Sequence, residues 1–303
     1  MSSRLLVTGA SGFVGRHLLA AVDAGMFGEN VQAVAWPGGR DLRDASAVAE
    51  FVAEVGATDV IHLAAQSFVP RAIAQPRETY EINVIGTLNL LEALTITEFR
   101  GRFLYISSGD IYGRVDLDDL PVNLATVPRP GNPYASSKLA AEELCLQWGR
   151  RTHRDVLIAR PFNHIGPGQS SDFVVSSLAH QVVAIKEGRQ PPVIDVGDIE
   201  ATRDFTDVRD VVAAYAAILA KGTAQTRYLV ASGVERTVAK VLQQMLTLAG
   251  TTAEVRVDPA RLRPSDQRRM VADASQTTQQ TGWRPTISFD QTLNDILTSV
   301  RTS

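Results

Sequence analysis

Several features that mark specialised protein classes are scarce in this 303-residue sequence. Its single cysteine, Cys145, excludes an internal disulfide and favours a reducing compartment. No apolar run is long enough to cross a membrane, because the most apolar one, 211–220, ends at Lys221. We therefore expect a soluble, cytoplasmic protein without a membrane partner.

The five histidines never fall at metal-ligand spacing, so we expect no structural metal. They are His17, His62, His153, His164 and His180. Basic charge is not in excess either, since 30 basic residues stand against 33 acidic ones and the net charge is -3. The basic residues are scattered rather than clustered, which argues against nucleic acid as a partner.

Short apolar runs alternate with longer segments of helical period over about the first 160 residues. This alternation predicts an α/β fold with a doubly wound parallel sheet, covered by helices. The expected strands are Leu5–Val7, Val31–Val34, Val60–Leu63, Phe103–Ile106 and Val156–Ala159. The expected helices begin near Gly12, Ser46, Pro76 and Pro133.

Beyond Arg160 the pattern loosens, and turn-rich segments separate helical stretches near Phe173–Ile185, Val208–Leu219 and Val238–Leu248. We expect residues 1–162 to form a dinucleotide-binding Rossmann domain. Residues 163–303 should form mainly a smaller α/β substrate-binding lobe, with some segments returning to the first domain.

Three glycines, Gly9, Gly12 and Gly15, lie between the first expected strand and the first expected helix. One glycine tightens the turn, another admits backbone N–H groups to a pyrophosphate, and the last lets helix pack on strand. Together with the positive end of the helix, this loop predicts phosphate binding. A plain strand-turn-helix corner is the alternative.

The end of the second strand contains no acid from Ala35 to Arg40. A carboxylate there would bind the ribose 2′-hydroxyl, and its absence admits a 2′-phosphate. We therefore expect NADP(H), with NAD(H) also accepted, and Arg40 as a candidate partner for the phosphate. Arg40 as a mere turn residue remains open.

Tyr134 and Lys138 are four residues apart on one face of the helix expected after Pro133. An ammonium near the phenol favours the phenolate, so we expect the Tyr134 pKa to fall from about 10 toward working pH. Ser108 follows an apolar strand, where a parallel sheet presents ligand-binding groups, and could hydrogen-bond a carbonyl oxygen. These three residues are the candidates for proton transfer.

The order of glycine loop, strand-end serine and Tyr-x-x-x-Lys resembles the extended short-chain dehydrogenase/reductases. The resemblance continues nearly to the end of the chain. It covers Leu63-Ala64-Ala65-Gln66, Asn83-Val84-Ile85-Gly86-Thr87, Arg160-Pro161-Phe162-Asn163, Arg203-Asp204-Phe205 and Arg263-Pro264.

The resemblance implies a cofactor site, a substrate site and a mode of assembly. Cofactor contacts are implied for Gly9, Ser11, Gly12, Phe13, Val14, Gly15, Arg40, Asp41, Leu42, Leu63, Ala64, Ala65, Asn83, Tyr134, Lys138, Pro161 and Phe162. Substrate contacts are implied for Gln66, Ser108, Asp110, Asn163, Arg203 and Arg263, with surface or interdomain ion pairs as the alternative for the two arginines. A homodimer through a four-helix bundle is also implied. It agrees with apolar residues on several faces of the expected helices, as in Leu88–Leu91 and Leu144-Leu146-Trp148.

Residues 160–169 and 197–205 resemble the GDP-mannose branch of this family, which implies a GDP-sugar substrate. The branch contains 4,6-dehydratases and 4-ketoreductases, and relatives that dehydrate carry a glutamate where this chain has Asp110. The shorter carboxylate reaches about 1.5 Å less far, and a misplacement of that size can cost ~10²-fold in rate. The resemblance thus implies reduction of GDP-4-keto-6-deoxy-D-mannose to GDP-D-rhamnose, with Ser108, Tyr134, Lys138 and Asp110 at the catalytic centre. A dehydratase, an epimerase and a non-catalytic NADP-binding sensor remain alternatives.

Overall fold

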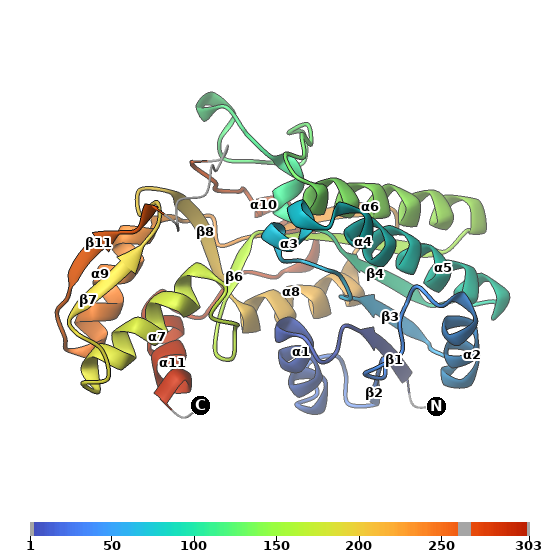
Figure 1. Ribbon diagram of the computed structural model, residues 1–303. Coiled ribbons are helices and arrows are strands. Elements are labelled where there is room, and N and C mark those ends of the chain that lie inside the picture. The colour runs from blue at the N-terminus through green and yellow to red at the C-terminus, as the bar shows by residue number, and fades with distance from the viewer. Residues whose placement is uncertain (1–2, 260–267, 302–303) are drawn as a thin grey trace.

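A parallel sheet of six strands forms the centre of the protein in the computed structural model, which describes residues 3–259 and 268–301 (Figure 1). The strand order is β2-β1-β3-β4-β5-β9, and every neighbouring pair is parallel. The strands are β1 (Ser3–Thr8), β2 (Val31–Ala35), β3 (Asp59–His62), β4 (Arg102–Ile106), β5 (Asp155–Pro161) and β9 (Thr226–Val230). The expected α/β class and the first five strands are confirmed.

Helices cover both faces of this sheet, which explains why its strands are continuous apolar runs. In Figure 1, α1 (Phe13–Asp23) and α8 (Val208–Lys221) lie below the sheet. On the other face lie α2 (Ala45–Val55), α5 (Gly86–Ile96) and α6 (Pro133–Thr152). Each face has its own buried apolar cluster, so the sheet lies between two hydrophobic cores.

Short elements connect the sheet to these helices. α3 (Val69–Ala74) is separated by Gln75 from α4 (Pro76–Tyr80), and α4 leads through the π-helix η1 (Glu81–Ile85) into α5 without a break. Between β4 and α6 the chain forms two 3₁₀ turns, η2 (Gly109–Tyr112) and η3 (Leu117–Asp119). The segment around η3 projects at the top of Figure 1.

A smaller lobe stands beside the sheet and has an apolar core of its own (Figure 1). Its helices are α7 (Val174–Lys186), α9 (Val238–Ala249) and α11 (Phe289–Arg301). Its strands pair as β10-β8-β6 and β11-β7, with β6 (Asn163–Ile165), β7 (Val193–Val196), β8 (Thr202–Asp207), β10 (Glu235–Thr237) and β11 (Glu254–Val257). α8, β9 and α10 (Ser275–Thr281) return to the sheet. The helical stretches expected in this half are confirmed as α7, α8 and α9.

The order of the strands predicts where a ligand binds. β1 has β2 on one side and β3 on the other, so the chain changes direction across the sheet at this point. In open α/β sheets, ligands occupy the crevice at the carboxyl ends of the strands beside such a switch point. The glycine loop follows β1 directly and therefore lies at this crevice. No helix in the described ranges 3–259 and 268–301 is both long and apolar enough to span a membrane.

Candidate active site

Ser108 and Tyr134 meet at the carboxyl end of β4. Ser108 precedes η2, and its Oγ accepts a hydrogen bond from the Asp110 amide at 3.1 Å. Tyr134 lies in the first turn of α6, where Pro133 is the first residue and the Asn132 side chain caps the helix. The Ser108 hydroxyl is near enough to the Tyr134 phenol to favour its ionised form, and Lys138 follows one turn later on α6.

The surroundings of Tyr134 and Lys138 set their charges. Burial raises the pKa of Tyr134 well above its usual 10, the Asp110 carboxylate adds to the rise, and the nearby Ser108 hydroxyl opposes it. The expected lowering of the Tyr134 pKa is therefore wrong for this structure, because desolvation outweighs any help from the ammonium. Burial also lowers the pKa of Lys138 to about 7. Tyr134 is thus a protonated phenol, as a proton donor must be.

Asp110 and Arg203 face each other from the two halves of the chain, Asp110 in η2 and Arg203 in β8. Asp110 retains solvent contact, yet the surrounding protein raises its pKa and the Arg203 guanidinium opposes that rise. Burial lowers the pKa of Arg203, while Asp110 and Asp198 raise it. These opposite charges come together beside the carboxyl end of β4, where the strand order predicts a ligand crevice.

The backbone around the glycine loop leaves no room for a side chain at Gly9 or Gly15. Gly9 has φ +70°, and a Cβ there would lie 2.8 Å from the Ala64 nitrogen. A Cβ on Gly15 would lie 2.3 Å from the Gly9 oxygen. Gly12 precedes α1, and no side chain caps this helix end. The loop therefore fits a dinucleotide pyrophosphate, which needs close backbone approach and a free helix N-terminus.

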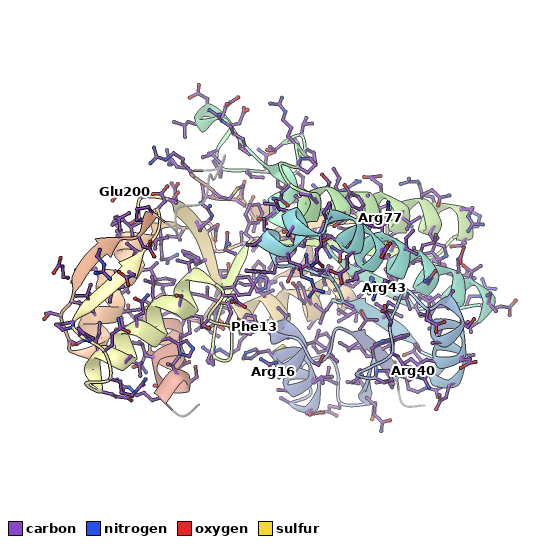
Figure 2. All side chains as sticks on the ribbon, in the orientation of Figure 1. Phe13, Arg16, Arg40, Arg43, Arg77 and Glu200 are labelled. Atoms are coloured by element: carbon purple, nitrogen blue, oxygen red, sulfur yellow. The ribbon has the colours of Figure 1, made fainter. Side chains whose placement is uncertain are left out.

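The end of β2 presents arginines where the adenosine of a dinucleotide is expected. The Arg40 guanidinium lies 5.1 Å from the centre of the Phe51 ring. The backbone carbonyl of Arg40 accepts a hydrogen bond from the Trp36 indole nitrogen. Asp41 accepts two hydrogen bonds from the Arg43 guanidinium, which lowers the Asp41 pKa. Leu42 is buried. Arg43, labelled with Arg40 in Figure 2, is a neighbour of the site that sequence reasoning missed.

Asn83, in the π-helix η1, joins three segments of the site. Its Oδ1 accepts a hydrogen bond from the Gln66 amide at 2.7 Å, and its Nδ2 donates to the Gln66 carbonyl and to Ser137. Ser137 in turn donates to the Tyr134 carbonyl at 2.7 Å. Leu63 and Ala64 donate their amides to Thr8, so the loop that contains Ala65 is fixed to the end of β1.

The Gln66 side chain points into the protein rather than toward the cleft. Its Nε2 donates to Phe68 and Thr79, and its Oε1 accepts from the Phe68 amide. Only 8% of the residue is exposed. The Gln66 side-chain amide therefore stabilises the loop after β3. This orientation does not favour the substrate contact expected for Gln66.

The segment after β5 contributes one buried and one exposed residue. Phe162 follows Pro161 and is 4% exposed, with its ring stacked on Tyr112 at 6.2 Å and against Gly109. Asn163 is exposed at the start of β6. Phe162 thus packs behind η2, whereas Asn163 is accessible to a ligand. Arg263 and Pro264 lie outside the described residues.

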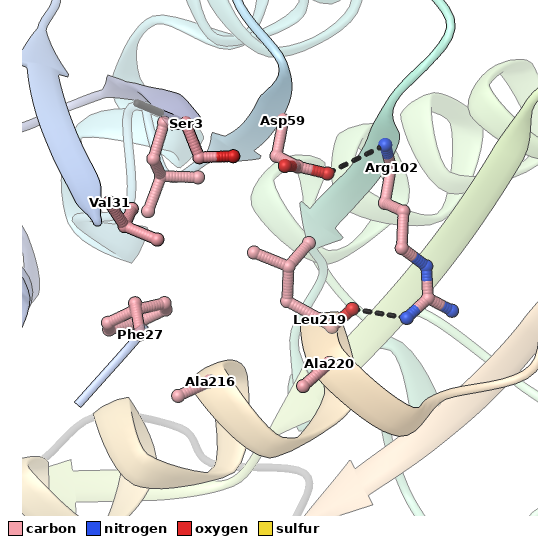
Figure 3. Close-up of a pocket in the computed structure, with 9 residues that line it drawn as sticks. Ser3, Phe27, Val31, Asp59, Arg102, Ala216, Leu219 and Ala220 are labelled. Atoms are coloured by element: carbon pink, nitrogen blue, oxygen red, sulfur yellow. Dashed lines mark hydrogen bonds between the residues drawn. The ribbon is translucent and has the colours of Figure 1, made fainter. Parts of the chain in front are cut away.

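A separate cavity of about 280 Å³ lies at the amino ends of the strands (Figure 3). Ser3, Val31, Asp59 and Arg102 line it, each from the start of a strand. The Arg102 amide donates to Asp59 at 2.9 Å, and its guanidinium bonds the carbonyl of Leu219 in α8. The cavity is at the opposite end of the sheet from Tyr134 and takes no part in the candidate site.

Comparison with known proteins agrees with this arrangement. A family model described as GDP-mannose 4,6 dehydratase matches residues 38–296. The chain is 46% identical over 297 residues to the GDP-6-deoxy-D-mannose reductase of Pseudomonas aeruginosa, covering 98% of this chain and 97% of that protein. The chain belongs to the GDP-mannose 4,6-dehydratase family.

Other relatives of this GDP-mannose 4,6-dehydratase family member act on different sugar nucleotides or were solved with cofactors. A dTDP-glucose 4,6-dehydratase of Mycolicibacterium smegmatis is 30% identical, over 97% of this chain and 92% of that one. RMD from Pseudomonas aeruginosa, complexed with NADPH, has a TM-score of 0.92 and 43% identity over 99% of both chains. UDP-glucose 4-epimerase of Thermus thermophilus, in complex with NAD, has a TM-score of 0.85 and 29% identity over 99% of both chains.

This family member also contains a buried hydrogen-bond chain around His62 that sequence reasoning missed. Thr87 donates to the Asn83 carbonyl, so its Oγ accepts from His62 Nε2 at 2.8 Å. His62 Nδ1 then accepts from Thr8, at 2.6 Å. The chain links the ends of β1 and β3 to the π-helix. A polar residue inside an apolar strand was the available sequence signal.

A second missed set joins the first helix to the lobe. Phe13 and the His164 ring stack nearly parallel, 7° apart, with 6.2 Å between centroids. Arg16 donates to the carbonyls of Ser11 and Gly168, and His17 Nε2 hydrogen-bonds the Pro167 carbonyl at 2.9 Å. Figure 2 labels Phe13 and Arg16 where sheet and lobe meet. In this GDP-mannose 4,6-dehydratase family member, α1 is thus hydrogen-bonded to the segment that follows β6.

Proposed function

We propose that the protein reduces the 4-keto group of GDP-4-keto-6-deoxy-D-mannose to give GDP-D-rhamnose, with NADPH as reductant and NADH also accepted. The observation that carries this proposal is the 46% identity, over nearly the whole chain, to a GDP-6-deoxy-D-mannose reductase. The similarity to RMD in complex with NADPH supports the cofactor. The protonated Tyr134 beside Ser108 supports the direction of the reaction, because reduction consumes a proton.

Each catalytic residue has one task in this proposal. The reduced nicotinamide, when bound, would supply a hydride to the carbonyl carbon at C4 of the sugar. Ser108 holds the carbonyl oxygen of the substrate, and Tyr134 donates its phenolic proton to that oxygen. Lys138 contributes positive charge next to Tyr134 as the phenol loses its proton.

The two ligands divide the cleft between them. We assign the pyrophosphate of the cofactor to the loop from Gly9 to Gly15 and its 2′-phosphate to Arg40. We assign the substrate diphosphate to Arg203 and Arg263, with Asn163 beside it, because guanidinium groups match phosphate oxygens. Residues 1–162 would then be the cofactor half and most of residues 163–303 the substrate half.

A 4,6-dehydratase is the second candidate, favoured by the description of the family model that matches residues 38–296. Two incubations separate the candidates. In the first, GDP-mannose is supplied with oxidised cofactor and no reductant; in the second, the 4-keto-6-deoxy sugar nucleotide is supplied with NADPH or NADH. Oxidation of reduced cofactor in the second supports the reductase. Consumption of GDP-mannose in the first, without oxidation in the second, supports the dehydratase, and tight NADPH binding with neither reaction supports a sensor.

We also propose a cytoplasmic homodimer through α5 and α6. Most of the apolar residues that suggested this are turned inward, since Leu91, Leu146 and Trp148 are at most 3% exposed. Ile85 and Ile96 are the better support, at 45% and 74% exposed on the outer side of η1 and α5. Light scattering at micromolar concentration should give a dimer mass, and a monomer mass would contradict the proposal. The double variant Ile85→Glu with Ile96→Glu should shift the mass to that of a monomer.

A further inference from the structure

The ammonium of Lys138 lies over the face of the Tyr105 ring, 4.4 Å from the ring centroid. Both residues are buried, with 2% of Lys138 and 1% of Tyr105 exposed. An aromatic face attracts an ammonium through its quadrupole, and the attraction is strongest where water is excluded. Tyr105 comes from β4 and Lys138 from α6, so this contact joins two elements of the site.

We infer that Tyr105 is a positioning residue for Lys138 and holds its ammonium through the face of the aromatic ring. The inference rests on the proposed function, in which Lys138 supports Tyr134. Tyr105 acts through Lys138 and needs no contact with either ligand. Its role is to keep the ammonium charged and in place on the buried side of α6.

The ring of Tyr105, rather than its hydroxyl, makes the useful contact. The hydroxyl is buried and has no hydrogen-bond partner among the described residues. Buried tyrosine hydroxyls usually have a partner, because an unpaired one costs free energy. The hydroxyl therefore does not explain a tyrosine at this position, whereas the ring face has a defined neighbour in Lys138.

A second ring supports Tyr105 from β3. The His62 ring lies 5.7 Å from the Tyr105 ring and is fixed at both nitrogens by Thr8 and Thr87. Burial lowers the pKa of His62 to about 3, and the nearby Lys138 contributes to this lowering. His62 is therefore neutral at working pH. It holds the ring in place without adding a positive charge that would repel Lys138.

The remaining charged or titratable groups that act on Lys138 come from its own helix. Glu142 and Cys145 raise the Lys138 pKa, and burial, which is the larger effect, lowers it to about 7. The Tyr105 face favours the ammonium in the same direction as Glu142 does. Removal of this face should therefore lower the proton affinity of Lys138 still further.

The chain offers a direct test, because it has only four lysines, Lys138, Lys186, Lys221 and Lys240. NMR of protein labelled with ¹³C-lysine, titrated with pH, would follow the Lys138 side-chain methylene signal, assigned by its loss in Lys138→Met. Tyr105→Phe keeps the ring and should leave the Lys138 titration unchanged. Tyr105→Leu removes the face and should reduce proton affinity about tenfold. Equal titration in the wild type and Tyr105→Leu, or equal shifts in both variants, would overturn the inference.

If Tyr105→Leu does not fold, a series that preserves shape decides the matter. Phenylalanine with one, two and three ring fluorines in place of Tyr105 weakens the face in steps at nearly constant volume. The Lys138 proton affinity should fall with each fluorine, and a flat series would overturn the inference. These titrations use neither cofactor nor substrate, so their outcome is independent of whether the protein is a reductase. In the working enzyme, turnover above pH 7 should fall in the same order as the proton affinity.

Discussion

Ser108, just after β4, and Tyr134, in the first turn of α6, bring their hydroxyls close together, and the Ser108 hydroxyl favours the ionised form of the phenol. The two residues are 26 positions apart in the chain. A substrate carbonyl oxygen placed between them would receive a hydrogen bond from one and a proton from the other. The predictions for Tyr134 follow from this geometry.

Replacement of Tyr134 by phenylalanine should lower the turnover number about 10²- to 10⁴-fold, because it removes the proton donor and little else. NADPH affinity, measured by fluorescence titration, should remain nearly the same. Single-turnover oxidation of NADPH by the keto-sugar nucleotide gives the rate. Wild-type turnover in Tyr134→Phe would show that another group supplies the proton.

Replacement of Lys138 by methionine should abolish most activity and yet stabilise the fold. The Lys138 pKa is lowered from 10.5 to about 7, so the folded state binds fewer protons than the unfolded state between these pH values. Stability of the wild type should therefore rise with pH from about 7 to about 10.5. The gain from Lys138→Met should be up to about 5 kcal/mol below pH 7, since one pKa unit is worth about 1.4 kcal/mol. Urea unfolding at pH 6 and pH 9.5 tests this, and a gain that does not shrink at the higher pH would contradict it.

Replacement of Gly9 by alanine should remove cofactor binding. Alanine would have to adopt the φ of +70° that Gly9 has, which side chains disfavour. Its Cβ would also lie 2.8 Å from the Ala64 nitrogen, so the glycine loop and the segment after β3 would have to move apart. Gly188→Ala is the matched control, because Gly188 has the same φ of +70° and no atom lies within 4 Å of the Cβ it would add. Calorimetric titration with NADPH should show no binding for the first variant and normal binding for the second. Normal NADPH binding by Gly9→Ala would argue against the assignment of the pyrophosphate to this loop.

Replacement of Arg40 by alanine should weaken NADPH binding about tenfold and leave NADH binding unchanged, since only NADPH carries the 2′-phosphate that a guanidinium would hold. Arg77→Ala, on α4, serves as a control for the loss of one surface charge. Kd values for both cofactors in each variant give the comparison. Equal weakening for the two cofactors would assign Arg40 to packing on Phe51 instead.

Replacement of Glu142 by glutamine should destabilise the protein by about 3 kcal/mol. Glu142 is fully buried and forms two hydrogen bonds with Arg160, which also donates to Tyr112 at 2.7 Å. The neutral amide would leave the Arg160 charge buried without compensation. Glu143→Gln is the control, because the half-exposed Glu143 pairs with the partly exposed Arg227, and such pairs contribute about 1 kcal/mol or less. Similar urea midpoints for the two variants would contradict the prediction.

The fold and the outline of the site could be predicted because their signals are local. Apolar runs such as Leu5–Val7 specify strands buried on both faces, and the helical repeat places Tyr134 and Lys138 on one face of α6. The glycines of the loop are predictable for the same reason, since only glycine fits where backbone approaches backbone. The structure shows each of these features at or within a few residues of its expected position.

The sequence by itself thus determined the sheet, the glycine loop and the spacing of Tyr134 and Lys138. Only the tertiary structure decided the direction of the Tyr134 pKa shift, the inward turn of Gln66 and the contact between Lys138 and Tyr105. Burial and partner choice depend on segments that meet through folding, as when Thr8 hydrogen-bonds His62 across 54 positions. A local sequence pattern does not specify which distant segments come into contact. Desolvation and long-range hydrogen bonds therefore follow only from the packed tertiary structure.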